Sequence, residues 1–214
     1  MNSSDEDENP GLARNTMTVA QLHQTLCSGA EGKEAQKLAE GAARSATKEL
    51  LLAADAHGRT AAHFAARFGQ DECLRSITDV LEADALRARD AYGRSPCDYA
   101  AKAGHVGCLK AVVEYGKAGL ASVRPKTAKE TAAHLAPANW SAVHWAAYGG
   151  HVDALDYIVS KLGVGALKVT ARHDGQDMTA RELALSWSTE EKGYSDGHKA
   201  AARWIKQKEA AGRK

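Results

Sequence analysis

The sequence predicts an all-α solenoid, in which short helix–turn–helix repeats stack into one elongated domain with turn or hairpin tips. The first observation is a phrase that begins at Asp55 and returns at Asp90, 35 residues later. The second is another copy, whose alanine pair at 146–147 lies 46 residues after the pair at 100–101. A unit of this length cannot bury its apolar face alone, so neighbouring copies must stack.

Each repeat is predicted to begin with a tight turn and a short first helix. In the first clear copy, Gly58 suits a turn that needs positive φ, and Thr60 suits the N-cap. His63 follows three residues later, where its imidazole can bond back to that hydroxyl. Gly69 then ends the helix. The corresponding residues of the later copies are Gly93, Ser95, Asp98 and Gly104, and then Ser141, His144 and Gly150.

The second helix of each repeat shows apolar residues at helical period. These segments are 73–77, 108–113 and 154–159. Before the first repeat we expect a helix pair over 18–43 and a short turn or helix over 46–54. Longer loops are expected at 171–178 and 186–195, after which Ser195-Asp196 caps a final helix that buries Ala201, Trp204 and Ile205. The stretch 116–138 accounts for the longer third spacing, and 126–135 within it is expected to form a helical loop.

The motif Asp-x-x-Gly-x-Thr-x-x-His-x-Ala-Ala-x-x-Gly-His resembles the ankyrin repeat. The first copy matches at Asp55, Gly58, Thr60, His63, Ala65, Ala66 and Gly69; the second at Asp90, Gly93, Ser95, Pro96, Ala100, Ala101, Gly104 and His105; the third at Ser141, His144, Ala146, Ala147, Gly150 and His151. The second copy departs by placing Asp98 at the His position, and the third has Asn139 where the turn Gly belongs. Degenerate copies at 22–29 and 174–184 extend the resemblance over about residues 18–210.

The predicted organisation is therefore one repeat domain with two short tails. Residues 1–16 form an acidic tail that we expect to be disordered, and 211–214 form a basic tail. The domain at 17–210 divides into an N-terminal capping repeat (17–54), repeats at 55–89, 90–125 and 126–173, the last with its insert, and a C-terminal capping repeat (174–210).

Composition narrows the class of protein. The formal net charge is +1, which gives no overall attraction to nucleic acid or to an anionic membrane. No apolar run approaches the roughly 20 residues of a membrane span. The four cysteines lack framework spacing, and we interpret them as reduced thiols in a cytoplasmic or nuclear protein.

The histidines and cysteines do not favour a catalytic or metal site. His63 and His144 fill the repeat's own His position, and His105 and His151 follow its Gly, so a structural role is expected. Cys97, His105 and Cys108 could suggest zinc, but no C-x-x-C pair exists and a fourth ligand is missing. We expect no enzyme activity, cofactor or small-molecule substrate.

The resemblance implies a binding module that acts through a concave groove, formed by the turn tips and the first helices. The variable positions mapped there are cationic and aromatic, which favours an acidic or amphipathic protein segment as ligand. The candidate partner-binding residues are His57, Arg59, Arg67, Phe68, Tyr92, Arg94, Lys102, Trp140 and Tyr148. The alternative is a permanent structural subunit of a large complex, docked through the inserts at 116–138 and 186–195. Nucleic-acid contact is a third possibility that the near-neutral charge disfavours.

Overall fold

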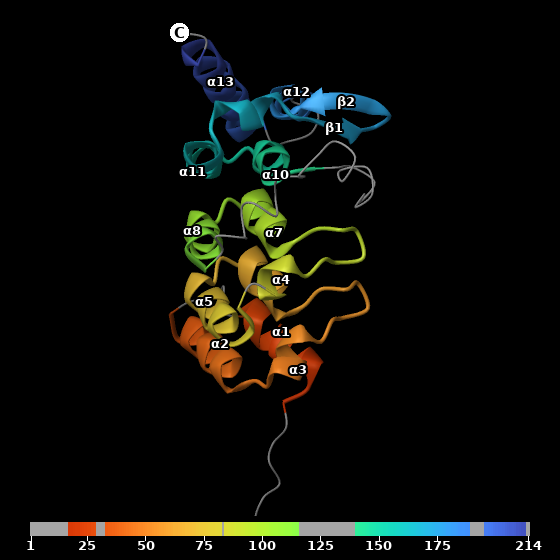
Figure 1. The fold of residues 1–214 in the computed structure, drawn as a ribbon, viewed down its shortest axis with the longest axis vertical. Helices are drawn as coiled ribbons and strands as arrows, with labels where there is room; N and C mark the ends of the chain where they lie inside the picture. Colours follow the sequence, from red (N-terminus) through yellow and green to blue (C-terminus); the bar gives the residue numbers. More distant parts are fainter. Residues whose placement is uncertain (1–16, 29–32, 83, 116–139, 189–194, 213–214) are drawn as a thin grey trace, which may run out of the picture.

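The computed structural model describes residues 17–28, 33–82, 84–115, 140–188 and 195–212. Their helices stack in two columns along an elongated molecule, so the predicted all-α solenoid is confirmed (Figure 1). The first-helix column contains α1 (Val19–Ser28), α4 (Ala61–Arg67), α7 (Pro96–Ala103), α10 (Ala142–Gly149) and α12 (Ala180–Ser186). The second-helix column contains α2 (Lys33–Ser45), α5 (Asp71–Leu81), α8 (Val106–Tyr115), α11 (Val152–Leu162) and α13 (Ser195–Ala211).

Shorter elements join the columns. α3 (Lys48–Leu52) follows the first helix pair, α6 (Asp84–Arg87) follows α5, and the 3-10 helix η2 (Val164–Lys168) follows α11. The expected helix pair over 18–43 and the short helix within 46–54 are therefore confirmed. The helical loop expected at 126–135 lies outside the described residues, and so do most of the inserts at 116–138 and 186–195.

Small side chains let the first helices pack closely. The alanine pairs at 65–66, 100–101 and 146–147 are all fully buried, and they lie where α4, α7 and α10 contact one another. Larger residues of the second helices, such as Ile77, Leu109 and Ile158, fill the space between the columns. Burial of this apolar surface from one repeat to the next is what holds the stack together.

Glycines end two of the first helices as predicted. Gly104 (φ 77°) and Gly150 (φ 72°) adopt the left-handed C-cap conformation, in which their N–H groups bond to carbonyls of the last helical turn. A side chain at either position would also collide with the next repeat. A Cβ on Gly104 would lie 2.6 Å from the imidazole of His151, so glycine is required by conformation and by space.

The prediction of a loop over 171–178 was wrong. This segment is an antiparallel β-hairpin of β1 (Thr170–His173) and β2 (Gln176–Thr179), in which Thr170 pairs with Thr179 and His173 with Gln176. Asp174 (φ 49°) and Gly175 (φ 82°) both have positive φ, as a type I′ turn requires. The Asp174-Gly175 pair carries the hairpin signal in the sequence, and Thr170 and Thr179 are the β-branched residues at the two ends of the hairpin.

The final helix follows the prediction. α13 begins at Ser195 and buries Ala201 and Ile205 completely, while Trp204 is half-buried against the core. It packs on both α12 and α10, so it closes the C-terminal end of the stack.

Candidate partner-binding face

The turns that precede α4 and α7 are built around an aspartate. We call residues 55–59 and 90–94 the finger turns. In the second, Oδ1 of Asp90 accepts hydrogen bonds from the backbone N–H groups of Tyr92 (2.9 Å) and Arg94 (2.8 Å). Asp55 makes the same contacts in the first finger turn. The two turns are joined at their tips, where Ala91 N–H donates to the carbonyl of His57 (2.8 Å).

The arginine of each finger turn is paired within its own repeat. Arg59 binds Oδ2 of Asp55 through Nε (2.7 Å), and Arg94 binds Oδ2 of Asp90 in the same way (2.7 Å). Each guanidinium also lies over a ring, Arg59 over Phe64 and Arg94 over Tyr99. Only 23% of each arginine side chain is exposed. The charges of Arg59 and Arg94 are therefore compensated inside the fold.

The carboxylates of the finger turns stay ionised because of these donors. Partial burial alone would raise the pKa of Asp55, but hydrogen bonds from Arg59 and His57 lower it to about 2. Burial would also raise the pKa of Asp90, but hydrogen bonds from Arg94 and Tyr99 keep that pKa below its usual range.

Imidazoles at the His position join the first helices α4 and α10 to the segments that follow them. Nε2 of His63 lies 3.0 Å from the carbonyl oxygen of Arg94, and Nε2 of His144 lies 3.0 Å from that of Val169. Because a carbonyl only accepts, Nε2 carries the proton and Nδ1 accepts from the N-cap residue, Thr60 or Ser141. Burial lowers the pKa of both residues, to about 4 for His144, so both rings are neutral.

A second set of side chains forms what we call the carbonyl ladder. Nε2 of His105 bonds to the carbonyl of Arg67 (3.1 Å), and Nε2 of His151 bonds to that of Lys102 (3.1 Å). His198 continues the ladder on the carbonyl of Tyr148 (2.7 Å). Gln70 begins it by donating to the carbonyl of Leu26. Each rung fixes the backbone of one first helix against the second helix of the following repeat.

Three carbonyls of the ladder, those that accept from His105, His151 and His198, belong to residues at the same position of successive repeats. We call Arg67, Lys102 and Tyr148 the cation–aromatic column. Arg67 and Lys102 are exposed and Tyr148 is half-buried. Among the described residues, no carboxylate lies within ion-pair distance of either cation. Burial lowers the pKa of Lys102, and the charges of Arg94 and Arg67 lower it further. Within the described part of the chain, Arg67 and Lys102 are therefore cations without a carboxylate partner.

Aromatic side chains gather at the C-terminal end of this column. We call Trp140, Trp145, Tyr148 and His173 the aromatic cluster. Trp140 lies 4.5 Å from Trp145, 5.3 Å from Tyr148 and 5.3 Å from His173, measured between ring centroids. Its indole N–H donates to the carbonyl of Arg172 in β1 (3.1 Å), which fixes its orientation. The ammonium of Lys102 lies 5.1 Å from the ring of Tyr148 and 5.4 Å from that of Trp145, within cation–π range.

Comparison with known families agrees with this geometry. The model for ankyrin repeats matches residues 35–122 with three copies. Residues 35–122 carry ankyrin repeats. The third clear copy, at 139–151, lies beyond the matched residues, yet its Ser141, His144 and Gly150 make the contacts that Thr60, His63 and Gly104 make in the earlier ankyrin repeats. A comparison with curated proteins gives no match.

The nine residues proposed from the sequence fall into three groups in the ankyrin stack. Arg59 and Arg94 are held by aspartates. Phe68 packs against the core beneath the guanidinium of Arg67, while His57 and Tyr92 are exposed at the finger tips, Tyr92 to 52%. The remaining four residues lie together. The Lys102 ammonium makes a cation–π contact with Tyr148, and the Tyr148 ring contacts that of Trp140. Arg67 is close enough for its charge to lower the pKa of Lys102.

Sequence reasoning did not find the contribution of His173 and His198. His173 reaches the aromatic cluster only because 170–179 is a hairpin. The role of His198 could have been predicted, since Gly197-His198 repeats the dipeptides Gly104-His105 and Gly150-His151 at nearly the same spacing.

The second ankyrin repeat replaces the usual histidine with Asp98. Its carboxylate caps α7 by accepting from the N–H and hydroxyl of Ser95 (both 2.8 Å), and Arg89 approaches it at 3.5 Å. Burial raises the pKa of Asp98. The carboxylate of Asp98 is therefore the N3 member of the capping box at the start of α7.

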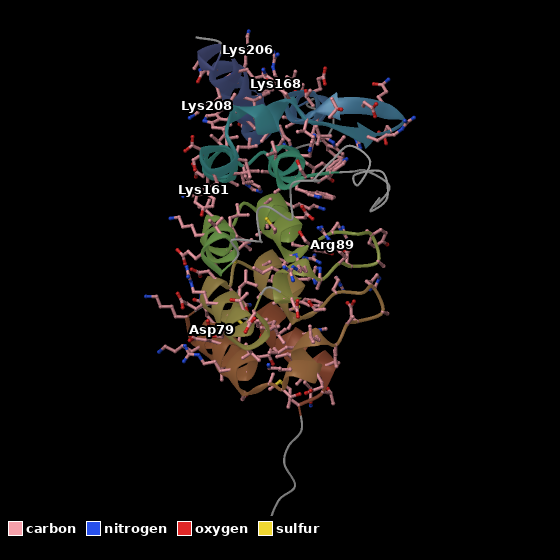
Figure 2. All side chains as sticks on the ribbon, viewed as in Figure 1. Asp79, Arg89, Lys161, Lys168, Lys206 and Lys208 are labelled. Carbon is pink, nitrogen blue, oxygen red and sulfur yellow. The ribbon has the colours of Figure 1, made fainter. Side chains whose placement is uncertain are left out.

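A separate group of lysines lies on the second-helix side of the C-terminal end, with Arg89 near the fingers on the other side (Figure 2). Lys161 lies over the ring of Tyr157 and Lys208 over that of Trp204. Lys208 also pairs with Asp156 (2.9 Å). Among the four labelled lysines, only Lys208 has a carboxylate of the described residues within ion-pair distance. The members labelled in the figure are Lys161, Lys168, Lys206 and Lys208.

The described residues contain neither a metal-ligand cluster nor a membrane-spanning helix. Within the described ranges, no three His, Cys, Asp or Glu side chains converge as metal ligands. The thiols of Cys73, Cys97 and Cys108 are buried and free, and burial raises the pKa of Cys73 and Cys108 to about 12. In the part of the chain that is described, no helix has the length and apolarity to cross a bilayer.

Proposed function

We propose that this protein is a non-catalytic interaction module whose ankyrin repeats hold an acidic or amphipathic segment of a protein partner. Ankyrin repeats are protein–protein interaction modules. The observation that carries the finer proposal is the pair of uncompensated cations, Arg67 and Lys102, beside the aromatic cluster. Arginine and aromatic side chains are the types that most often dominate binding energy at interfaces. The binding face would be the concave groove of the stack.

The fold supports binding with little loss of freedom. The carbonyl ladder fixes the backbone at Arg67, Lys102 and Tyr148, and ring contacts fix the aromatic cluster. A pre-formed face avoids most of the ordering cost that association imposes on side chains and loops. The free thiols are consistent with a reducing compartment, which supports our proposal of the cytoplasm or the nucleus.

The test is affinity capture from cell extract with wild type and Arg67→Glu/Lys102→Glu, read by mass spectrometry. Both side chains are exposed and uncompensated, so the variant is expected to keep its melting temperature while losing its partners. The matched control is Arg87→Glu/Lys110→Glu, which changes two exposed cations on α6 and α8. Loss of the same partners from the control would show that net charge, and not this face, governs capture.

The rival function is a permanent structural subunit docked through the inserts. It is favoured by one observation: α8 ends at Tyr115 and α10 begins at Ala142, so a long segment separates two repeats that still pack together. Capture of identical partners by wild type and Arg67→Glu/Lys102→Glu, together with loss on replacing 118–137 by a short Gly-Ser linker, would establish the rival and reject the groove.

A further inference from the structure

The acidic tail carries four consecutive carboxylates, Asp5-Glu-Asp-Glu8, close to the start of the ankyrin stack. The tail, residues 1–16, lies outside the described residues, but its point of attachment is well defined. Met17 packs against the core, and the hydroxyl of Thr18 accepts a hydrogen bond from the first turn of α1. The carboxylates are therefore tethered to a fixed position by the eight residues 9–16.

The tail joins α1 at the end opposite to the cations of the first helices. Burial raises the pKa of the Cys27 thiol, and the charges of Arg67 and Arg59 oppose that shift, so Arg67 lies near the C-terminal end of α1. Gln70 agrees with this placement, since it donates to the carbonyl of Leu26. Because α1 has ten residues, its two ends are about 15 Å apart.

The tether is nevertheless long enough to bring the carboxylates to both cations. Arg67 is on α4, which packs on α1, and Lys102 is on α7, which packs on α4. With about 8–10 Å for each packed helix, Lys102 lies roughly 23 Å from the start of α1. Eight extended residues span at most about 26–29 Å. The lysines on α11 and α13 are at the other end of the stack (Figure 1).

Arg67 and Lys102 also differ from other cations near the attachment point. Arg59 is held by Asp55, and Arg44 pairs with Glu40 within α2. Lys102, by contrast, has its pKa lowered by burial and by the charges of Arg94 and Arg67. A run of carboxylates placed beside Arg67 and Lys102 would relieve this repulsion between like charges.

Resting on the proposed function, we propose that the acidic tail is an intramolecular ligand of this face, in which the carboxylates of residues 5–8 pair with Arg67 and Lys102 and compete with an acidic partner segment. Exposed ion pairs are individually weak. A short flexible tether, however, supplies a millimolar effective concentration, so a tail that binds with a dissociation constant of about 1 mM still occupies much of the face. The competition lowers the apparent affinity of a partner segment by about two- to fivefold.

The first measurement compares two full-length chains labelled with ¹⁵N. One is the wild type, and the other carries Asp5→Asn, Glu6→Gln, Asp7→Asn and Glu8→Gln, which removes the charge of the tail at constant length. Amide chemical shifts are expected to differ between the two chains at residues next to Arg67 and Lys102 and to agree in α13. Shifts confined to the tail and α2, or no shifts at all, would overturn the proposal.

The second measurement adds a synthetic peptide with the sequence of residues 1–16 to each chain and follows the same amides. The peptide is expected to bind the neutralised chain at least twofold more tightly than wild type, because the wild-type tail competes with it. The difference should disappear in 0.5 M salt, where exposed charges are screened over about 4–5 Å. Equal affinity for both chains at low salt would contradict an intramolecular contact.

Variants of the neutralised chain locate the contact. Arg67→Gln/Lys102→Gln is expected to weaken the peptide at least fivefold. The matched control is Lys33→Gln/Lys48→Gln, which removes two exposed cations of α2 and α3 near the attachment point and should leave the affinity unchanged. Weakening by the control alone would assign the tail to the N-terminal end of the stack and reject the proposal.

The outcomes separate this inference from the proposed function. If neutralising the tail changes nothing, while cellular partners are still lost from Arg67→Glu/Lys102→Glu, the tail is not a ligand of the face and the interaction module remains. If the peptide binds through Arg67 and Lys102, while the same double variant captures all wild-type partners, the tail contact is supported and the proposed partner site is wrong.

Discussion

The phenolic O–H of Tyr99 donates a 2.8 Å hydrogen bond to Oδ2 of Asp90, the same oxygen that accepts from Nε of Arg94. This contact is specific to the second repeat, because the first has Phe64 at the same position. The aspartate, the arginine and the phenol form one buried network that holds the finger turn against α7. Its strength can be measured by removing one member at a time.

Tyr99→Phe is expected to lower the free energy of unfolding by about 1 kcal/mol, the usual net value of one hydrogen bond. The ring itself should fit, since Phe64 occupies the equivalent place. Asp90→Ala should cost more, about 2–4 kcal/mol, because it leaves a half-buried guanidinium and a buried phenol without an acceptor. Urea titration measures both changes. Equal costs for the two variants would contradict the shared-acceptor arrangement.

An arginine of a finger turn should contribute more to folding stability than an arginine exposed on a first helix. Arg94→Gln removes an ion pair with a buried carboxylate and is expected to lower stability by about 1–2 kcal/mol. Arg67→Gln should stay within about 0.5 kcal/mol of wild type, as exposed substitutions usually do. Thermal and urea unfolding of the two variants would measure this difference. A destabilised Arg67→Gln would place that side chain among the structural residues.

Stability should fall in mild acid because of His144. The unfolded chain binds a proton at this residue below about pH 6.5, whereas the folded chain does so only near pH 4. Protonation therefore favours the unfolded state as pH falls from about 6.5 to 4, by about 3 kcal/mol at most. Urea midpoints at pH 7, 6 and 5 should show a shallower decline for His144→Asn. Identical slopes would mean that the imidazole titrates normally in the folded protein.

Two glycine-to-alanine substitutions in helices should act in opposite directions. Gly41 lies in α2, where an added Cβ would have no atom within 4 Å, so Gly41→Ala should stabilise by about 0.5–1 kcal/mol. A Cβ on Gly149 would lie 2.4 Å from the carbonyl oxygen of Lys102. Gly149→Ala should therefore destabilise by about 1–3 kcal/mol, because α10 must move from α7. Melting temperatures test the pair, and stabilisation by both would refute the close approach.

Removing one rung of the carbonyl ladder should loosen one end of the stack. His198→Ala leaves the carbonyl of Tyr148 without its imidazole and is expected to cost about 1–2 kcal/mol. Because repeats couple mainly to their neighbours, the loss should be concentrated in α12 and α13. Hydrogen exchange should be faster in these helices and unchanged in α4. Uniformly faster exchange would indicate that the repeats unfold as one unit.

The sequence was sufficient to predict the repeat architecture because the residues that determine the turn and the first helix of each repeat lie close together in the chain. Thr60, His63 and Gly69 each satisfy a backbone requirement within a few residues, and the alanine pairs require close packing wherever they occur. The hairpin at 170–179 was missed because 171–178 was interpreted as a loop and 174–184 as a degenerate repeat. There the turn chemistry of Asp174-Gly175 outweighed the resemblance.

The candidate site was less predictable, since the neighbours of an arginine in the fold decide whether a carboxylate compensates its charge. Arg59 and Arg67 look alike as sequence positions, yet only Arg59 has an aspartate four residues earlier that folds back onto it. That pairing could have been anticipated from Asp55-x-x-x-Arg59. The meeting of Trp140 with His173 could not, because the contact depends on how the hairpin crosses the third repeat.

The rung between His151 and Lys102 joins residues on either side of the long segment that separates α8 from α10. The bond depends on the two repeats that it connects and not on the number of residues between them. A protein cleaved between Tyr115 and Trp140 is therefore expected to stay assembled, through this bond and through the packing of α7 on α10.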